Sequence, residues 1–213
     1  MNPLLYTQAC AHLAALDPIW AAHIERIGPC LHQPLPTRDP YQALVRSIAY
    51  QQLHAKAAEA ILGRFLALYP DAPFPSPEQL LATSPEQLRA CGFSASKLAT
   101  IQGIAQARLD GLVPDHELAR NLDETALIER LTQLRGVGRW TVEMLLIYTL
   151  EHMDILPADD FGVREGYRRL FGLPAQPTRK QMLDLAQPWS PYRTVAAWYL
   201  WRVPTIVADV STN

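Results

Sequence analysis

Hydrophobic positions recur at helix-like intervals along most of the chain. Residues 40–68 show this clearly, with Leu44, Ile48 and Phe65 among the apolar positions and alanine common between them. A polar stretch at residues 51–54 interrupts the pattern, so two helices with a break there are predicted. The chain shows no apolar–polar alternation typical of strands and no internal repeat. The pattern therefore predicts an all-α fold.

Several helix starts are marked by residues that cap a first turn. Ser76 and Ser84 each open the sequence Ser-Pro-Glu-Gln, in which the serine can accept a hydrogen bond from the helix and the proline fits the first turn. A helix is predicted to begin at each serine, and the first of the two to be very short. Further helices are predicted over residues 96–108, 123–133, 140–150, from 161 onward, 178–186 and 192–201.

Composition is that of an ordinary globular protein and excludes several classes. Of the 213 residues, 49% are hydrophobic and 19% are charged. The three cysteines are too few for an iron–sulfur cluster and too scattered for a disulfide framework. No apolar run reaches the roughly 18 residues of a membrane span, and no signal peptide is recognisable. We therefore expect a cytoplasmic protein without a membrane partner.

The charge balance argues mildly against a nucleic-acid partner, because the net charge is −2. Its distribution is uneven. Residues 161–202 hold seven arginines and lysines against two acidic residues, whereas residues 108–129 are acidic. This pattern excludes a protein that coats DNA by charge alone, and it allows an enzyme with one basic face.

A glycine-rich loop joins two of the predicted helices. In the sequence Leu-Arg-Gly-Val-Gly-Arg-Trp-Thr, Gly136 and Gly138 flank Val137, and the loop runs directly into a helix. The first N–H groups of a helix lack internal partners and lie at the positive end of its dipole, so they can hold a phosphate oxygen without a lysine. The alternative is a plain glycine turn between two helices.

Two carboxylates, Asp159 and Asp160, follow Pro157 and precede the helix predicted from residue 161. One of them can cap that helix. Burying a second carboxylate beside the first is costly, so one of the two is expected to face a cleft or a cation.

Taken together, these segments resemble the helix-hairpin-helix DNA glycosylase superfamily. Trp140, directly after Gly-Val-Gly-Arg, is similar to the 3-methyladenine DNA glycosylase II branch, and Asp-Asp-Phe-Gly-Val follows at the family's spacing. The resemblance extends upstream to Ile-Ala-Tyr-Gln-Gln-Leu-His at 48–54 and downstream to the segment 188–198. It covers residues 40–201, with four motifs in the family's order.

The resemblance implies a two-lobed helical fold with a cleft between the lobes, in a single compact monomeric unit. Residues 1–39 with 165–213 would form the first lobe, and residues 40–164, carrying the hairpin 132–141, the second. Larger members of this branch have an N-terminal β-rich domain, and the segment before residue 40 is too short for one.

The family's essential carboxylate corresponds to Asp160, with Asp159 as the rival. Breaking an N-glycosidic bond develops positive charge on the sugar, which a carboxylate stabilises while it orients a water. Members that also cut the strand have a lysine at the position of Trp140, so a monofunctional enzyme that leaves an abasic site is implied. Trp140, Trp198 and Phe161 would wall the base pocket by stacking and cation–π contact.

Each of these aromatic residues has the alternative of a core position, and we assign Trp189 and Trp201 to the core. The family fills the gap left by the flipped base with a wedge, for which the candidates here are Gln52, Leu53 and His54. Gln52 matches the wedge position best, and His54 could be cationic in the minor groove. The alternative is ordinary polarity at a helix start.

Contacts to the DNA backbone are implied for the hairpin residues Gly136, Gly138, Arg139 and Thr141. The family's hairpin also binds a monovalent cation, Na⁺ or K⁺, through backbone carbonyls, here those of Thr132, Leu134 and Val137. The other histidines show no metal-ligand spacing, so no catalytic metal is expected.

The implied activity is monofunctional excision of alkylated bases, of the 3-methyladenine or 7-methylguanine type, from double-stranded DNA in base excision repair. A bacterial-type cytoplasmic enzyme acting on chromosomal DNA would fit. The first alternative is a non-catalytic protein that binds alkylation damage on the same fold. The second is a helical protein-interaction module whose hairpin is only a turn, and four motifs in order disfavour it.

Overall fold

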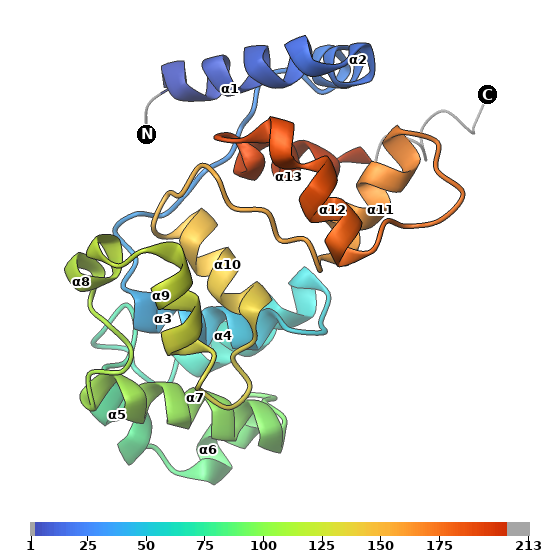
Figure 1. Ribbon diagram of the computed structural model, residues 1–213. Coiled ribbons are helices and arrows are strands. Elements are labelled where there is room, and N and C mark those ends of the chain that lie inside the picture. Colours follow the sequence, from blue (N-terminus) through green and yellow to red (C-terminus); the bar gives the residue numbers. More distant parts are fainter. Residues whose placement is uncertain (1–2, 204–213) are drawn as a thin grey trace. The chain divides into compact units, whose positions relative to one another are not determined.

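The computed structural model describes residues 3–203, which fold into thirteen α-helices and one short 3₁₀ helix (Figure 1). No strand occurs in this range, so the predicted all-α class is confirmed. Within residues 3–203 no helix has both the length and the apolar character needed to cross a bilayer.

The chain forms two compact units, and each is described by itself. The first unit comprises residues 1–34 and 151–213, and the second residues 35–150. These boundaries differ from the expected ones, 39/40 and 164/165. The segment 151–164, which includes Asp160, groups with the first unit, where Ile155 bonds to Thr194 of α13 and Asp160 bonds to Trp201.

The helices of the first unit are α1 (Pro3–Leu16), α2 (Pro18–Ile27), α11 (Phe161–Leu170), α12 (Arg179–Leu185), η1 (Gln187–Trp189) and α13 (Arg193–Leu200). The helices of the second unit are α3 (Pro40–Tyr50), α4 (Ala55–Leu66), α5 (Pro77–Ala82), α6 (Pro85–Ala90), α7 (Ala95–Leu109), α8 (His116–Asn121), α9 (Glu124–Leu131) and α10 (Arg139–Tyr148).

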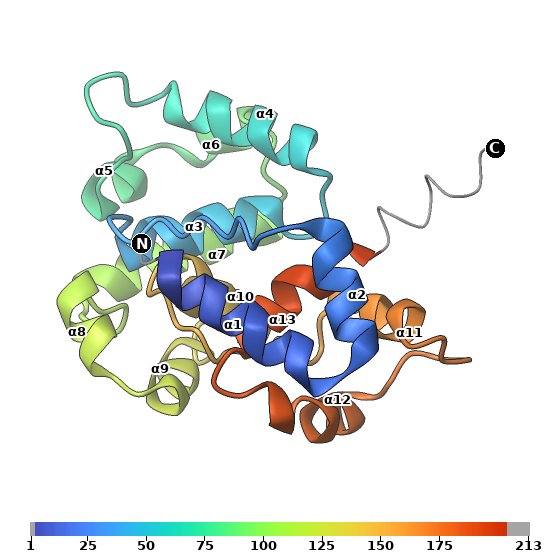
Figure 2. The ribbon, with the colours of Figure 1, turned by 90° about the horizontal axis from the view of Figure 1, so that it is seen from above.

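Helix α3 is the centre of the second unit. It packs against α4, α7 and α10, while α5 and α6 cover α7 and α9 lies against α10 (Figure 2). Its apolar face buries Leu44 and Ile48 completely, and Phe65 of α4 and Ile101 of α7 lie in the same core. This burial is the main stabilising contribution, because each such side chain contributes about 1.5–3 kcal/mol.

Helix α13 is the corresponding centre of the first unit, where it packs against α1, α2 and α11. Gly166 of α11 permits one of these contacts. A Cβ there would lie 2.1 Å from the carbonyl oxygen of Leu200, so any other residue would push the two helices apart.

The predicted helix starts match the structure closely. Ser76 and Ser84 both form capping boxes, each with the glutamine three residues later. The first of the two helices is very short, as expected, and the second is equally short, since each has six residues. The break between α3 and α4 falls at residues 51–54, as the polar stretch predicts.

Candidate functional site

The glycine loop between α9 and α10 has a conformation that its sequence explains. Gly136 has φ +83, and a Cβ there would lie 2.3 Å from Oγ1 of Thr100 on α7. Val137 is 3% exposed and anchors the loop in the core, and its N–H donates to the carbonyl of Leu134 at 3.0 Å. The hairpin therefore rests directly on α7, and only glycine fits at position 136.

The start of α10 has no side-chain cap. Its N-cap residue is Gly138, at φ −90, so the first N–H groups of the helix receive no serine or aspartate oxygen. Arg139 extends from this first turn, half exposed, and its Nε donates to Glu143 at 2.9 Å. An uncapped helix start beside a tethered guanidinium is suited to an anion such as a phosphate.

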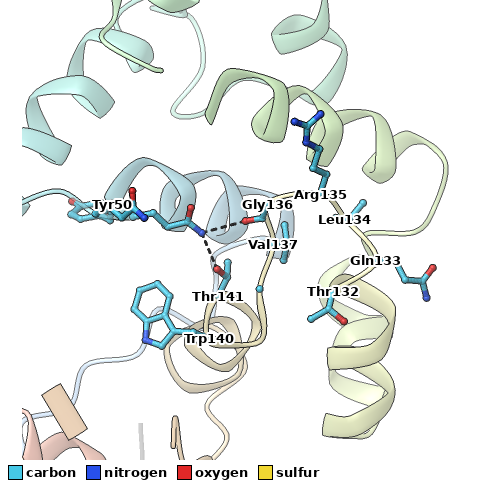
Figure 3. A pocket seen from close by; sticks show the side chains of 12 residues that line it. Tyr50, Thr132, Gln133, Leu134, Arg135, Gly136, Val137, Trp140 and Thr141 are labelled. Carbon is cyan, nitrogen blue, oxygen red and sulfur yellow. Dashed lines mark hydrogen bonds between the residues drawn. The ribbon is translucent and has the colours of Figure 1, made fainter. Parts of the chain in front are cut away.

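The turn between α3 and α4 lies beside the hairpin. Both line one cavity of about 740 Å³, together with Tyr50 and Trp140 (Figure 3). Gln52, Leu53 and His54 are all exposed on this turn, and Gln52 has φ +57. Of the three wedge candidates, Gln52 lines this cavity together with the hairpin residues, and Leu53 and His54 follow it on the exposed turn.

Gln51 connects the turn to the hairpin. Its side-chain amide donates to the carbonyl of Gly136 at 3.4 Å and to Oγ1 of Thr141 at 3.2 Å, the two dashed lines of Figure 3. Thr141 is only 1% exposed. Its side chain is therefore engaged by Gln51, and the expected contact of Thr141 with the DNA backbone stays a prediction.

A second cavity, of about 470 Å³, shares Trp140 and Tyr50 with the first and is also lined by Arg38 and Arg46. Burial lowers the pKa of both arginines, and the mutual repulsion of the two lowers that of Arg38 further. The guanidinium carbon of Arg46 lies 5.2 Å from the ring centre of Phe74. The sequence analysis did not single out either arginine.

In the first unit, Asp160 is the N-cap of α11. Its Oδ1 accepts hydrogen bonds from the backbone N–H of Val163 at 2.9 Å and from Nε1 of Trp201 at 2.8 Å. Asp159 is exposed instead and pairs with Arg179 at 3.0 Å. Two donors thus fix the orientation of the Asp160 carboxylate, whereas Asp159 forms a surface ion pair.

The aromatic residues near Asp160 differ from those expected. Trp198 is 4% exposed and lies in the core of the first unit, and the guanidinium carbon of Arg202 is 3.4 Å from its ring centre. Its expected role in the base pocket stays a prediction, and within the first unit its ring is covered by Arg202. Trp201, which we had assigned to the core, is the tryptophan bonded to Asp160. Phe161 is 71% exposed beside it in the sequence.

Much of the basic stretch 161–202 is engaged within the first unit. Glu165 accepts hydrogen bonds from Arg168, Arg169 and Gln176, and these bonds hold the pKa of its carboxyl far below the usual range. Arg193 pairs with Asp154 at 2.7 Å. The arginines here mainly stabilise the fold around α11 and α13.

No group of three or more metal-binding side chains that could hold a metal occurs within the part of the chain that the structure describes. A cation held by backbone carbonyls would not need such a group of side chains. Thr132, Leu134 and Val137 all line the larger cavity. The carbonyl of Leu134 accepts a hydrogen bond from Val137, and the expected ion at these three carbonyls stays a prediction.

The comparisons with known proteins agree on one family. The profile of the HhH-GPD superfamily of base excision DNA repair proteins matches residues 45–191. The chain is 45% identical over 197 residues to DNA-3-methyladenine glycosylase 1 of Schizosaccharomyces pombe, covering 92% of this chain and 86% of that protein. It is 37% identical over 202 residues to the alkylbase DNA glycosidase-like protein mag2 of the same organism, covering 94% and 95%. Among solved structures, the S. pombe 3-methyladenine DNA glycosylase in complex with abasic DNA matches with a TM-score of 0.85 at 45% identity, over 92% of this chain and 95% of that one.

Proposed function

Because the chain belongs to the HhH-GPD superfamily of base excision DNA repair proteins, we propose that it is a monofunctional DNA glycosylase that hydrolyses the N-glycosidic bond of alkylated bases, of the 3-methyladenine and 7-methylguanine type. Its partner is double-stranded DNA, on which it acts as a monomer. A cytoplasmic enzyme of bacterial type is the corresponding cellular setting.

The observation that carries this proposal is the arrangement of Asp160. Its carboxylate is fixed by the N–H of Val163 and the indole N–H of Trp201. A carboxylate held in this way stabilises the positive charge that develops on the sugar as the bond to the base breaks, and it orients the attacking water. Alkylated purines are already good leaving groups, so a separate acid is not needed.

Trp140 is the residue that the second unit contributes to recognition of the base and to the outcome of the reaction. Its indole lines both cavities of that unit. An electron-rich ring attracts a cationic alkylated base by stacking and by cation–π interaction. Since indole has no amine that could form a Schiff base with the sugar, the product is an intact strand with an abasic site.

The hairpin binds the DNA backbone. The uncapped N–H groups at the start of α10 bind a phosphate oxygen, and Arg139 adds a positive charge beside them. A Na⁺ or K⁺ ion held by the carbonyls of Thr132, Leu134 and Val137 would lie between the hairpin and the phosphate and offset the negative charge of the phosphate. If that ion is used, replacing K⁺ by a large organic cation should weaken binding of an abasic-site duplex.

The test uses duplex DNA methylated with dimethyl sulfate and compares the wild type with Asp160→Asn. Asparagine retains the capping oxygen of α11, so the fold is kept while the charge is removed. We expect free methylated bases from the wild type and a loss of at least about 100-fold in Asp160→Asn. Asp159→Asn is the matched control, because it removes the neighbouring, surface-paired charge, and it should release bases at the wild-type rate.

Nicking distinguishes the remaining outcomes. Strand breaks should appear only after hot alkali, and breaks without alkali would contradict the monofunctional assignment. If the wild type binds methylated duplex tightly but releases no base, the chain is instead a damage-binding protein and the glycosylase proposal fails.

A further inference from the structure

Lys97, on the first turn of α7, lies against the C-terminal end of α3. Its Nζ donates to the carbonyl of Ala49 at 3.0 Å and to the carbonyl of Gln51 at 2.6 Å. The last carbonyls of a helix lack internal partners and lie at the negative end of its dipole, so an ammonium group there stabilises the helix end. Lys97 is partly buried here, and this burial lowers the pKa of its ammonium group.

The backbone that Lys97 holds leads directly into the turn of the wedge candidates. Gln52, the next residue, has φ +57, a left-handed conformation that is unfavourable for a residue with a side chain. Such a conformation persists only where neighbouring contacts maintain it. The turn is closed by a hydrogen bond from the N–H of Leu53 to the carbonyl of Tyr50 at 3.2 Å, and Lys97 holds from outside the carbonyl of Gln51, the residue directly before Gln52.

The same turn is tied to the hairpin from its other side. Gln51 donates to Gly136 and Thr141, as described above. One helical turn after Lys97, Thr100 contacts the hairpin at Gly136, where it leaves no room for a Cβ. Helix α7 therefore contacts the wedge turn through Lys97 and the hairpin through Thr100. The turn and the hairpin lie on the same side of the second unit, where they line one cavity.

We propose that Lys97 is a positioning residue that holds the wedge turn in its left-handed conformation, at a fixed place relative to the phosphate-binding hairpin, before DNA binds. This inference rests on the proposed function. A wedge that is already ordered loses little conformational freedom on entering the gap left by the flipped base, so more of its contact energy is available for unstacking. Lys97 itself touches neither the base nor the sugar.

The test separates this role from a general effect on stability. Lys97→Met keeps the aliphatic stem and removes the ammonium group, and Lys97→Arg keeps a donor of the same charge. The matched control is Arg130→Met, because Arg130 of α9 also donates to loop carbonyls, those of Gly111 and Leu112, at a place remote from the wedge turn. All variants are compared by urea unfolding.

Excision is measured in single turnover on one methylated oligonucleotide, as a duplex and as a single strand. A wedge acts only where a partner strand leaves a gap. Lys97→Met should therefore slow duplex excision about tenfold or more and change single-strand excision less than twofold, while Lys97→Arg and Arg130→Met remain close to the wild type. In a Gln52→Ala background, Lys97→Met should add almost nothing, since both act through the same wedge.

A readout without catalysis keeps this test separate from the proposed activity. A duplex carrying a tetrahydrofuran abasic-site analogue opposite 2-aminopurine reports unstacking as a rise in fluorescence. Wild type and Arg130→Met should produce the rise and Lys97→Met should not. If no variant excises bases but this difference persists, the glycosylase proposal fails and the role of Lys97 stands. Equal losses on duplex and single strand, or full fluorescence with Lys97→Met, would overturn the positioning role.

Discussion

Replacing Gly136 by alanine tests whether the hairpin rests on α7 in the way described. Two costs add. The first is conformational, because φ at this position is +83 and an L-residue with a Cβ loses about 1–2 kcal/mol there. The second is steric, since the new Cβ would lie 2.3 Å from Oγ1 and 2.9 Å from Cγ2 of Thr100. Overpacking of this kind costs about 1–3 kcal/mol, so Gly136→Ala should lower the free energy of unfolding by about 2–5 kcal/mol.

Gly138→Ala is the matched control for this substitution. Gly138 has φ −90, and a Cβ there meets no atom within 4 Å. Its effect on stability should stay within about 1 kcal/mol, the difference between glycine and alanine at a helix cap. On our proposal, however, the new methyl group lies at the uncapped start of α10, so it should weaken binding of an abasic-site duplex while the free protein remains stable.

Thr100→Ala separates the two costs at Gly136. It removes Oγ1 and Cγ2 of Thr100, the two atoms closest to the new methyl group, and leaves φ unchanged. In a double-mutant cycle followed by urea unfolding, Thr100→Ala should recover the steric part of the loss caused by Gly136→Ala, about 1–3 kcal/mol, and leave the conformational part in place. No coupling between the two substitutions, or equal stability of Gly136→Ala and Gly138→Ala, would refute the contact between hairpin and α7.

Three further predictions follow from single contacts. Trp201→Phe keeps an aromatic ring but removes the indole donor to Asp160. It should slow single-turnover excision about 10- to 100-fold without abolishing DNA binding, since a hydrogen bond to a charged group contributes about 1.5–3 kcal/mol. A rate equal to the wild type would contradict a role for that bond. The arginine contacts lower the pKa of Glu165 below its usual value of 4.5, so the stability they contribute is complete above pH 4.5 and is lost as the pH falls below it. In Glu165→Gln, the urea midpoint of unfolding should therefore fall less steeply in acid than in the wild type. Binding to an undamaged duplex should have a shallow salt dependence, with a slope of log K against log salt no steeper than about −3, because the proposed phosphate contact uses backbone N–H groups and releases few counterions. A slope near −8 would show that the basic stretch contacts DNA extensively.

The sequence predicted the elements whose signals are local. The Ser-Pro-Glu-Gln segments specify helix starts by capping chemistry, and two glycines around an apolar residue specify the loop before α10. Four ordered motifs predicted the family, which the profile match and the relatives confirm. In each case the residues that carry the signal are close together in the chain, so no knowledge of packing was needed.

Trp198 and Trp201 show where local signals end. They are three residues apart at the end of α13, so both fall on nearly the same side by helical periodicity, and either could face the carboxylate. Tertiary packing decides between them, because Trp201 approaches α11 where Gly162 leaves space: a Cβ there would lie 2.9 Å from Cδ1 of Trp201. The glycine directly after Phe161 was the available signal, since glycine inside a helix start often marks a close approach.

Lys97 was missed for a related reason. A lysine on the first turn of a predicted helix is ordinarily solvated, and nothing in the sequence places it against residues 49 and 51, more than forty positions earlier. The domain boundary at 150/151 depends in the same way on packing, because the segment before Asp160 bonds to Thr194 of α13. Contacts of this kind follow from the topology and are not encoded in the local pattern.

The net charge of −2, which counted against a nucleic-acid partner, is consistent with the proposed mode of binding. Glu165 and Asp154 already pair with Arg168, Arg169 and Arg193, so these arginines contribute to the fold. At the hairpin the positive potential comes instead from backbone N–H groups at the start of α10, which add nothing to the formal charge. Such donors have a fixed geometry and grip one phosphate at a defined place. Gln51 ties the wedge turn to the same hairpin, so the wedge enters the duplex at a fixed position relative to the bound phosphate. Lysines scattered over the surface could not fix that position.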